Sequence, residues 1–162
     1  MSTIVQNPDP VLRATAPAVP SHMFGTDELA TIISDMKEAL AAQDDGVAIA
    51  APQIGVSLRI FVVAQKASTK FDSEMVFINP EFVRIGKTKE LLSEGCLSVR
   101  WKYGTVKRAT SATVRAYNEQ GNEFVTNGRG LLAQIFQHEI DHLNGVLFID
   151  KAKDVEDVPP QK

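Results

Sequence analysis

Apolar side chains recur at intervals of three and four residues in two stretches of the chain, the spacing of an α-helix with one buried face. The first stretch follows Thr26, which can cap a helix, and stops before Asp44. The second precedes the stop signal Asn144-Gly145. The apolar positions are Leu29, Ile32, Ile33, Met36 and Leu40 in the first, and Leu131, Leu132, Ile135, Phe136, Ile140 and Leu143 in the second. The pattern predicts two helices, the second buried over more than half of its circumference.

Shorter runs rich in β-branched and aromatic residues predict strands between these helices. They cover residues 58–64, 75–80, 81–85, 113–117 and 123–126, with a turn expected at Asn79-Pro80 and an exposed hairpin loop over 65–74. The strands and helices do not alternate as βαβ units. We therefore expect an α+β fold, in which short antiparallel sheets pack around a central buried helix, with one further N-terminal helix.

Neither end of the chain shows a regular pattern. Four prolines within residues 1–22 disfavour helix and sheet, so this segment is expected to be an extended arm wrapped on the body. Residues 151–162 are rich in charged residues, three acidic and three basic, contain Pro159-Pro160 and predict a flexible tail. A length of 162 residues suits one catalytic domain, predicted to span 1–162.

Composition narrows the class of protein. A net charge of −3 gives no electrostatic reason to expect nucleic acid or an anionic membrane as a partner. Apolar runs stay well below the roughly 18 residues of a membrane span, and the first residues do not resemble a leader. The single cysteine, Cys96, excludes an internal disulfide and fits a reducing compartment. We expect a cytoplasmic protein, with an organelle left open.

The second predicted helix contains His138-Glu139-Ile140-Asp141-His142. Residues four apart lie one helical turn above each other, so both imidazoles can face one ion with Glu139 beside a bound water. A chance match to this short pattern is the alternative. The remaining histidine, His22, is expected in a solvated loop.

A hydrolytic metal needs three protein ligands and one open position. Cys96, within Glu94-Gly95-Cys96-Leu97-Ser98, is the candidate third ligand because thiolate binds such metals strongly. A lone cysteine is otherwise more often a small buried hydrophobe. Its coexistence with the histidine pair favours the ligand.

Three blocks in order resemble the peptide deformylases, which remove the formyl group from the N-terminal methionine of nascent proteins. They are Gly46-Val47-Ala48-Ile49-Ala50-Ala51-Pro52-Gln53, then Glu94-Gly95-Cys96-Leu97-Ser98, then Gln137-His138-Glu139-Ile140-Asp141-His142-Leu143. A weaker likeness runs from Pro8 to about Asp150.

The resemblance implies that Cys96, His138 and His142 hold a metal, natively Fe²⁺, with Zn²⁺, Ni²⁺ or Co²⁺ as substitutes in purified protein. A metal-bound water would attack the formyl carbon, and Glu139 would carry its proton to the leaving amine. The oxyanion would be stabilised by Gln53 and by the backbone N–H of Leu97. Without the resemblance, Gln53 would be interpreted as a loop amide bonded to its neighbours.

The same resemblance implies how the substrate, an N-formylmethionyl nascent peptide near the ribosome exit, is held. The backbone of Gly46, Val47 and Ala48 would pair with the peptide as an added strand. An apolar pocket for the methionine side chain is expected from Val47, Leu131 and Ile135. Gly95 is placed with these substrate-binding residues, and its small size is expected to relieve crowding near the ion.

This chain departs from the family at several positions. Ala48 and Ile49 replace a usual Gly-Leu, Gln134 replaces an aliphatic pocket residue, and a long C-terminal helix is absent from the prediction. Residues 100–103, Arg-Trp-Lys-Tyr, follow the cysteine block where proline is common, either as a solvated loop or as a lip that alters specificity. Two other functions stay open, a zinc peptidase and a peptide-binding module without turnover.

Overall fold

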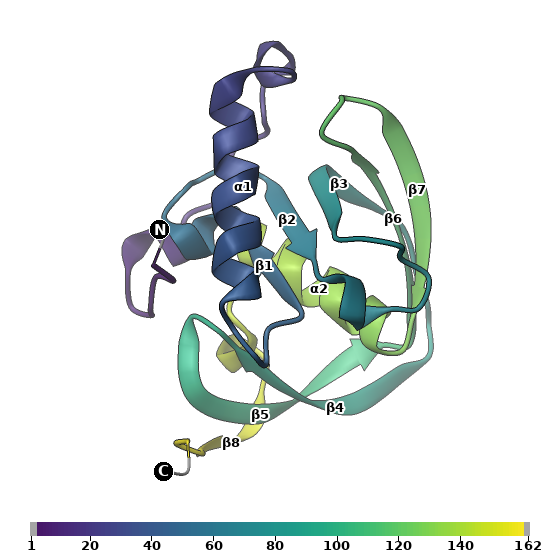
Figure 1. Cartoon of the computed structure of the whole chain (residues 1–162). Coiled ribbons are helices and arrows are strands. Elements are labelled where there is room, and N and C mark those ends of the chain that lie inside the picture. The colour runs from purple at the N-terminus through teal and green to yellow at the C-terminus, as the bar shows by residue number, and fades with distance from the viewer. Residues whose placement is uncertain (1–2, 161–162) are drawn as a thin grey trace.

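The computed structural model describes residues 3–160 and has two helices and two antiparallel sheets (Figure 1). Helix α1 (Asp27–Ala41) begins where the Thr26 hydroxyl accepts a hydrogen bond from the Leu29 N–H. Helix α2 (Leu131–Leu143) ends at Asn144, and Gly145 follows with a φ of 76°. Both helices and the α+β class agree with the prediction. No helix among the described residues is long and apolar enough to cross a membrane.

The larger sheet has five strands in the order β1-β2-β3-β6-β7, and the smaller has three in the order β4-β5-β8. Their bounds are β1 Ala48–Ala50, β2 Ile60–Val63, β3 Met75–Ile85, β6 Ser111–Tyr117 and β7 Glu123–Arg129, then β4 Lys89–Cys96, β5 Val99–Ala109 and β8 Lys153–Asp157. Short 3₁₀ helices occupy Pro10–Leu12, Ser21–Met23, Ala51–Ile54, Gln65–Ala67 and Phe148–Asp150.

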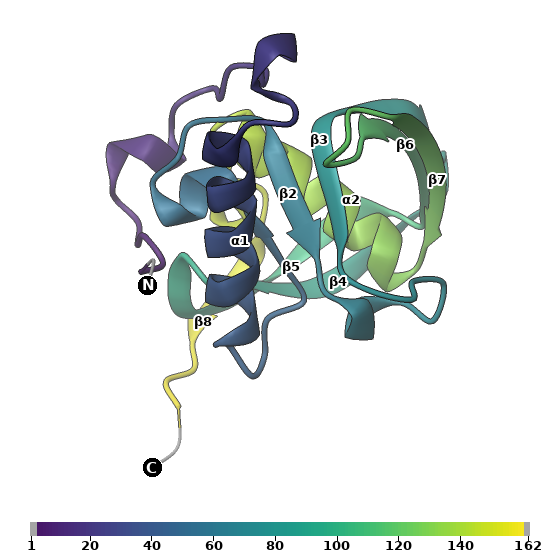
Figure 2. The same cartoon turned by 45° about the horizontal axis from the view of Figure 1, so that its top comes forward.

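Strand β2 separates two hydrophobic clusters, which explains its uninterrupted apolar sequence. Phe61 and Val63 pack into the cluster that contains the buried face of α2. Ile60 and Val62 point to the opposite side, into the cluster that contains α1. Side chains alternate between the faces of a strand, so β2 is buried on both faces between the two helices, as Figure 2 shows. This arrangement holds α2 against the larger sheet.

Two predicted strands and a turn form one strand in the structure. Strand β3 continues through Asn79-Pro80, where its pairing with β6 shifts register and Asn79 has a φ of 52°. The Asn79 side chain accepts from the Val19 N–H at 2.8 Å and donates to the Val19 carbonyl at 3.0 Å. The polar residue and the proline therefore produce an irregularity that ties the arm to the sheet.

The two ends are more ordered than the sequence predicts. The arm contains two 3₁₀ turns, with His22 exposed in the second, and its Val5 and Asn7 N–H groups bond the carbonyls of Gln53 and Ser98. Residues 153–157, predicted to be tail, pair with β5 as β8, although all five are exposed. Residues 1–2 and 161–162, the outermost parts of the predicted arm and tail, lie outside the described residues.

Candidate metal centre

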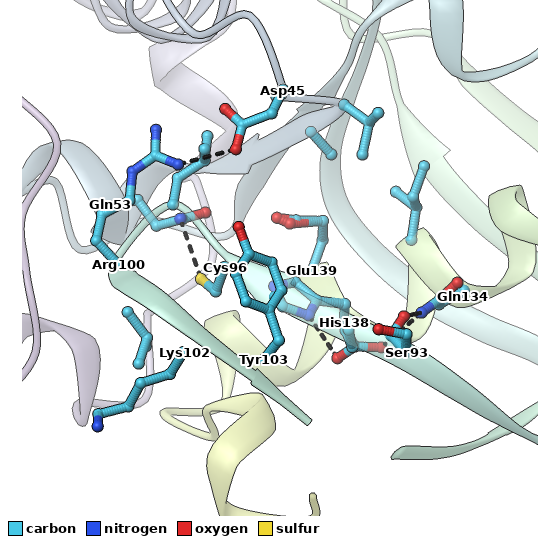
Figure 3. A pocket seen from close by; sticks show the side chains of 18 of the residues that line it. Asp45, Gln53, Ser93, Cys96, Arg100, Lys102, Tyr103, Gln134, His138 and Glu139 are labelled. Atoms are coloured by element: carbon cyan, nitrogen blue, oxygen red, sulfur yellow. Dashed lines mark hydrogen bonds and ion pairs between the residues drawn. The ribbon is translucent and has the colours of Figure 1, made fainter. Parts of the chain in front are cut away.

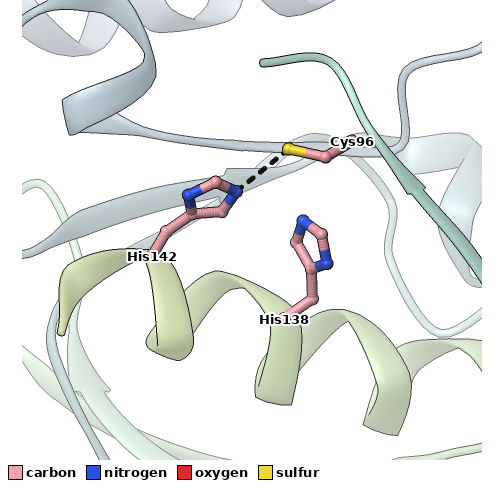
Figure 4. A group of neighbouring side chains, drawn as sticks. All are labelled: Cys96, His138 and His142. Atoms are coloured by element: carbon pink, nitrogen blue, oxygen red, sulfur yellow. Dashed lines mark hydrogen bonds between the residues drawn. The ribbon is translucent and has the colours of Figure 1, made fainter. Parts of the chain in front are cut away.

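Helix α2 and the end of β4 bring Cys96, His138 and His142 together (Figure 4). One potential ligand atom from each lies within 4.8 Å of the others. The Cys96 Sγ and His142 Nε2 are 3.2 Å apart. Glu139, between the two histidines in sequence, is 1% exposed, and its Oε2 is buried without a hydrogen-bond partner among the described residues.

A buried carboxylate holds the imidazole of His138. The Glu94 Oε2 lies 2.7 Å from the His138 Nδ1, which leaves the Nε2 of that ring for another partner. Arg108 donates to both Glu94 oxygens, at 3.0 and 2.6 Å, and to Asp141 at 2.8 Å. Gln134 adds a bond to Glu94 at 3.1 Å. The ring orientation is thus fixed by a network that extends from β4 through β5 to α2.

Burial and neighbouring charges shift the pKa values of this network. Burial raises the pKa of Glu94, but hydrogen bonds from His138 and Arg108 outweigh it and bring the pKa to about 2. For Glu139 burial dominates and raises the pKa to about 7, against the opposing charge on His138. Burial lowers the pKa of His142 well below its ordinary value, so this ring is neutral. A neutral imidazole is the form that binds a metal.

His138 behaves differently from His142. Burial lowers its pKa, but the adjacent Cys96 sulfur and Glu94 carboxylate outweigh burial and raise it well above the ordinary value. A cation at this position would displace the proton that these groups favour.

Gln53 is buried beside the cysteine. Its side-chain carbonyl accepts from the Ala50 N–H at 2.8 Å, and its amide nitrogen donates to the Ser98 hydroxyl at 3.1 Å, with the Cys96 sulfur 3.6 Å away. Leu97 is buried in the turn between β4 and β5. Gln53 is therefore both bonded to its neighbours, as the loop interpretation expected, and directed at the cysteine.

Strand β1 forms an edge of the larger sheet, and its free side borders the site. The Ala64 N–H bonds the Val47 carbonyl at 2.8 Å, so Val47 faces β2. Alternate residues of an antiparallel strand bond to opposite sides, which leaves the N–H and C=O of Ala48 on the free edge. An extended peptide can pair there.

A cavity of about 300 Å³ opens beside the cysteine and the helix (Figure 3). All the predicted site residues line it except His142, which is 1% exposed and joins the site through Cys96. Ile135 is buried, whereas Leu131 is 49% exposed at the rim. Gln134 also lines the cavity, and its amide nitrogen is held by the Ser93 carbonyl at 3.1 Å.

One expectation needs correction. Residues 100–103 are not a solvated loop, because they lie within β5 and line the cavity. The small size of Gly95 also makes room for a protein neighbour, since an added Cβ would lie 2.6 Å from the Tyr103 ring. A side chain at position 95 would therefore displace Tyr103.

Sequence reasoning overlooked Arg108 and Asp141 and left Glu94 without a role. Arg108 lies on β5, which the apolar pattern did not predict, and no motif contains it. Glu94 is in a quoted block, and a charged residue that the fold must bury next to a metal ligand could have been recognised there. Asp141 sits within the histidine motif, where it looked like part of the polar helix face.

These donors suit a divalent transition metal. Two imidazoles and one thiolate match the ligand types of zinc and iron sites, and the unpartnered Glu139 oxygen adjoins them. With three protein ligands, one coordination position stays open for water or substrate. The fold and this donor set define the class of metal-dependent hydrolases with paired histidines on one helix.

The comparisons with known proteins identify the group within that class. The family model for polypeptide deformylase matches residues 1–158. A peptide deformylase from Desulforudis audaxviator is 43% identical over 149 residues, 92% of each chain, and one from Acidobacterium capsulatum is 45% identical over 90% of this chain and 83% of its own. This chain belongs to the polypeptide deformylase family, as its three motifs predicted.

Solved structures agree. A peptide deformylase from Legionella pneumophila has a TM-score of 0.86 and 40% identity, and covers 95% of this chain with 87% of its own. A Met-Ala-Ser-bound class I type b peptide deformylase from Acinetobacter baumannii has a TM-score of 0.85 and 32% identity, covering 93% and 97%. The chain is thus a metal-dependent deformylase, an enzyme, and its substrates are N-formylmethionyl nascent peptides.

Proposed function

We propose that the chain removes the N-formyl group from the N-terminal methionine of nascent polypeptides with the residues that line this cavity. The observation that carries the assignment of residues is the convergence of Cys96, His138 and His142 within 4.8 Å, next to the buried Glu139. Helix α2 is then the central element of one catalytic domain. The cytoplasm of a bacterium, near the ribosome exit, is the place where such substrates arise.

Cys96, His138 and His142 hold the metal, which we assign as Fe²⁺ because of the family, with Zn²⁺, Ni²⁺ or Co²⁺ as substitutes. A bound divalent cation acts as a Lewis acid and makes water nucleophilic near neutral pH. Glu94 supports the assignment, because its bond to the His138 Nδ1 presents the other ring nitrogen to the ion.

Glu139 acts as the proton carrier. Its carboxyl accepts a proton from the attacking water and delivers it to the amine that leaves, for which a pKa near 7 is well suited. Gln53, from its position beside Cys96, and the Leu97 N–H donate to the oxygen that becomes negative when water adds to the formyl carbon. The Gln53 side-chain carbonyl accepts from the Ala50 N–H, which fixes the position of the amide before the substrate arrives.

The free edge of β1 binds the substrate backbone at Ala48, with Gly46 before it on the same side, whereas Val47, whose carbonyl bonds the Ala64 N–H, contributes its side chain. The methionine side chain enters the cavity between Val47, Ile135 and Leu131, with Gly95 opposite. The related Acinetobacter baumannii structure contains bound Met-Ala-Ser, which supports a peptide in this cavity. Main-chain pairing is independent of side-chain identity, which suits an enzyme with many substrates.

The test is formate release from formyl-Met-Ala-Ser by protein loaded with Fe²⁺ or, separately, Zn²⁺, with the metal content measured in each sample. Wild-type protein is expected to release formate with at least one metal. Glu139→Gln is expected to keep its metal and lose about 10²- to 10⁴-fold in kcat. The exposed Glu38→Gln on α1 is the matched control and should match wild type.

Two results would contradict the proposal. Glu139→Gln protein with wild-type kcat would remove Glu139 as proton carrier. Fully metal-loaded wild type that binds the peptide without releasing formate would instead support the peptide-binding module. Cys96→Ser tests whether Cys96 is a metal ligand or only a small buried hydrophobic residue. Full metal occupancy in that variant would exclude Cys96 as third ligand.

A further inference from the structure

Arg100 and Trp101, which follow Val99 at the start of β5, have no role in the chemistry above; we call these two residues the lip. Arg100 donates to Asp45 at 3.0 Å and to the side-chain carbonyl of Gln43, so it links β5 to the segment that leads into β1. The Arg100 N–H is 3.3 Å from the Gln6 side-chain carbonyl of the arm. Hydrogen bonds therefore join the lip to the segment that leads into β1 and to the N-terminal arm.

Trp101 has a backbone conformation that bulky residues rarely adopt, with a φ of 65°. Its carbonyl accepts from the Val158 N–H at 2.7 Å, which secures this conformation from the C-terminal side. The Arg100 guanidinium lies 4.6 Å from the centre of the indole. The indole is nevertheless 37% exposed and lines the cavity. Strain of this kind at a cavity indicates a function.

The lip offers an aromatic surface with little net charge, because Asp45 neutralises Arg100. Apolar and aromatic side chains pack on such a surface, whereas an acidic side chain must compete with Asp45 for the guanidinium. Figure 3 shows Arg100 and Asp45 on the side of the cavity away from Gln134 and His138.

The path of a bound peptide leads to this surface. A peptide with its formyl group beside Gln53 and Cys96 that pairs with the free edge of β1 runs back past Gly46 toward Asp45. Each extended residue advances the chain about 3.3 Å, so the two residues after methionine extend about 7 Å along this path. Asp45 and Trp101 line the same cavity as Cys96, so the lip borders the path of these two residues.

We propose that Trp101 determines substrate specificity, favouring formylmethionyl peptides with an aromatic or large apolar side chain in one of the two positions after methionine. The proposal rests on the proposed function and names the substrates that this cavity prefers. Arg100 positions the indole and sets the width of the cavity by bonding Asp45.

The experiment compares kcat/KM for formyl-Met-Ala-Ser, formyl-Met-Phe-Ser and formyl-Met-Ala-Phe. Wild type is expected to favour at least one phenylalanine peptide over formyl-Met-Ala-Ser by about three- to ten-fold, the contribution of one aromatic pair. Trp101→Gly removes the indole, and glycine tolerates the positive φ at this position. The ratio of kcat/KM for the phenylalanine peptides to kcat/KM for formyl-Met-Ala-Ser should therefore fall to about one in this variant. Tyr117→Ala, which removes a similarly exposed aromatic ring outside the cavity, should keep the wild-type ratio.

Fluorescence gives a readout that does not require turnover, because Trp101 is the only tryptophan of the chain. In the Glu139→Gln background, formyl-Met-Phe-Ser or formyl-Met-Ala-Phe should change the emission at about three- to ten-fold lower concentration than formyl-Met-Ala-Ser. The proposal would be overturned if Trp101→Gly kept the wild-type ratio of kcat/KM values and if the peptides left the Trp101 emission of the Glu139→Gln protein unchanged. Absence of formate from every peptide would instead reject the proposed function, and the fluorescence titration would still decide whether the lip selects peptides.

Discussion

Two arginines, each bound to two carboxylates, show how burial changes what an ion pair does. Arg108 binds Glu94 at 2.6 Å and Asp141 at 2.8 Å, and its side chain is 2% exposed. Arg115 binds Glu81 at 2.9 Å and Glu123 at 3.3 Å, with a side chain 46% exposed. The charges and partners are equivalent, but only Arg108 is enclosed by protein.

The difference follows from solvent. Around Arg115, water can replace either partner and screens both charges, so the pairs contribute little. Around Arg108, removal of its charge leaves the buried Glu94 carboxylate with His138 as its remaining charged neighbour, which destabilises the fold. Burial raises the pKa of Glu94, and only the bonds from His138 and Arg108 reverse this effect. The buried arginine therefore keeps Glu94 charged in a position where it can orient a metal ligand.

The largest effect is expected for Arg108→Met, which keeps much of the volume and removes the charge. The buried Glu94 carboxylate, which then keeps only His138 of its two charged partners, should lower the free energy of unfolding by about 3 to 5 kcal/mol, measured by denaturant titration. Arg115→Met is the matched control, since it removes the same charge pattern from the surface. Arg115→Met should unfold at the same denaturant concentration as wild type, within error.

Equal losses in Arg108→Met and Arg115→Met would show that burial does not separate the two arginines. If Arg108→Met protein fails to fold, Arg108→Met combined with Glu94→Gln removes both charges and should recover part of the stability. Absence of any recovery would mean that Arg108 stabilises by packing instead of by compensating Glu94.

A smaller loss of stability, with a larger effect on the metal, is expected for Glu94→Gln. The substitution conserves shape but removes the charge that Arg108 and His138 share, so unfolding should become easier by about 1 to 3 kcal/mol. His138 loses the carboxylate that orients it, and metal affinity should fall about 10- to 100-fold, measured by competition with a chelator. The exposed Glu90→Gln on the same strand is the control. Wild-type affinity in Glu94→Gln would show that the network supports the fold alone.

The sequence predicted what depends on local spacing. Both helices and the hairpin strands 113–117 and 123–126 follow from periodicity, whereas the approach of Cys96 to the two histidines was predicted from three short motifs and the family that they resemble. The buried network could not be predicted in the same way. Arg108 and Glu94 are 14 residues apart, and the register of β4 on β5 pairs Arg108 with Glu90, so the contact between Arg108 and Glu94 depends on tertiary packing.

The strand that carries the lip was not predicted, for a related reason. Residues 100–103 are polar and aromatic, so their sequence resembles a loop, yet they continue a strand paired on one side with β4 and on the other with β8. Strand β8 is itself acidic and fully exposed, and its apolar pattern is too weak to predict it. Pairing between two such segments depends on tertiary contacts, which propensity does not encode.

The smallest effect on stability is expected for an ion pair of intermediate exposure, that of Arg13 with Asp150. Their side chains are 42% and 37% exposed, and two hydrogen bonds join them, at 2.5 and 3.1 Å. The hydrogen bond from Arg13 lowers the pKa of Asp150 below its ordinary value of 3.8. A lowered pKa in the folded state means that the pair stabilises the fold above pH 3.8 and loses this contribution as the pH falls below that value.

Asp150→Asn tests this pair, because the amide oxygen can still accept from the Leu147 N–H that now bonds the carboxylate at 3.1 Å. At pH 7 the variant should be less stable than wild type by about 0.5 kcal/mol, reduced because water screens both groups. The difference should shrink at pH 3 and in high salt. A difference of several kcal/mol at pH 7, or one that persists at pH 3, would place Asp150 with Glu94 and show that enclosure by protein is not what divides the strong pairs from the weak ones.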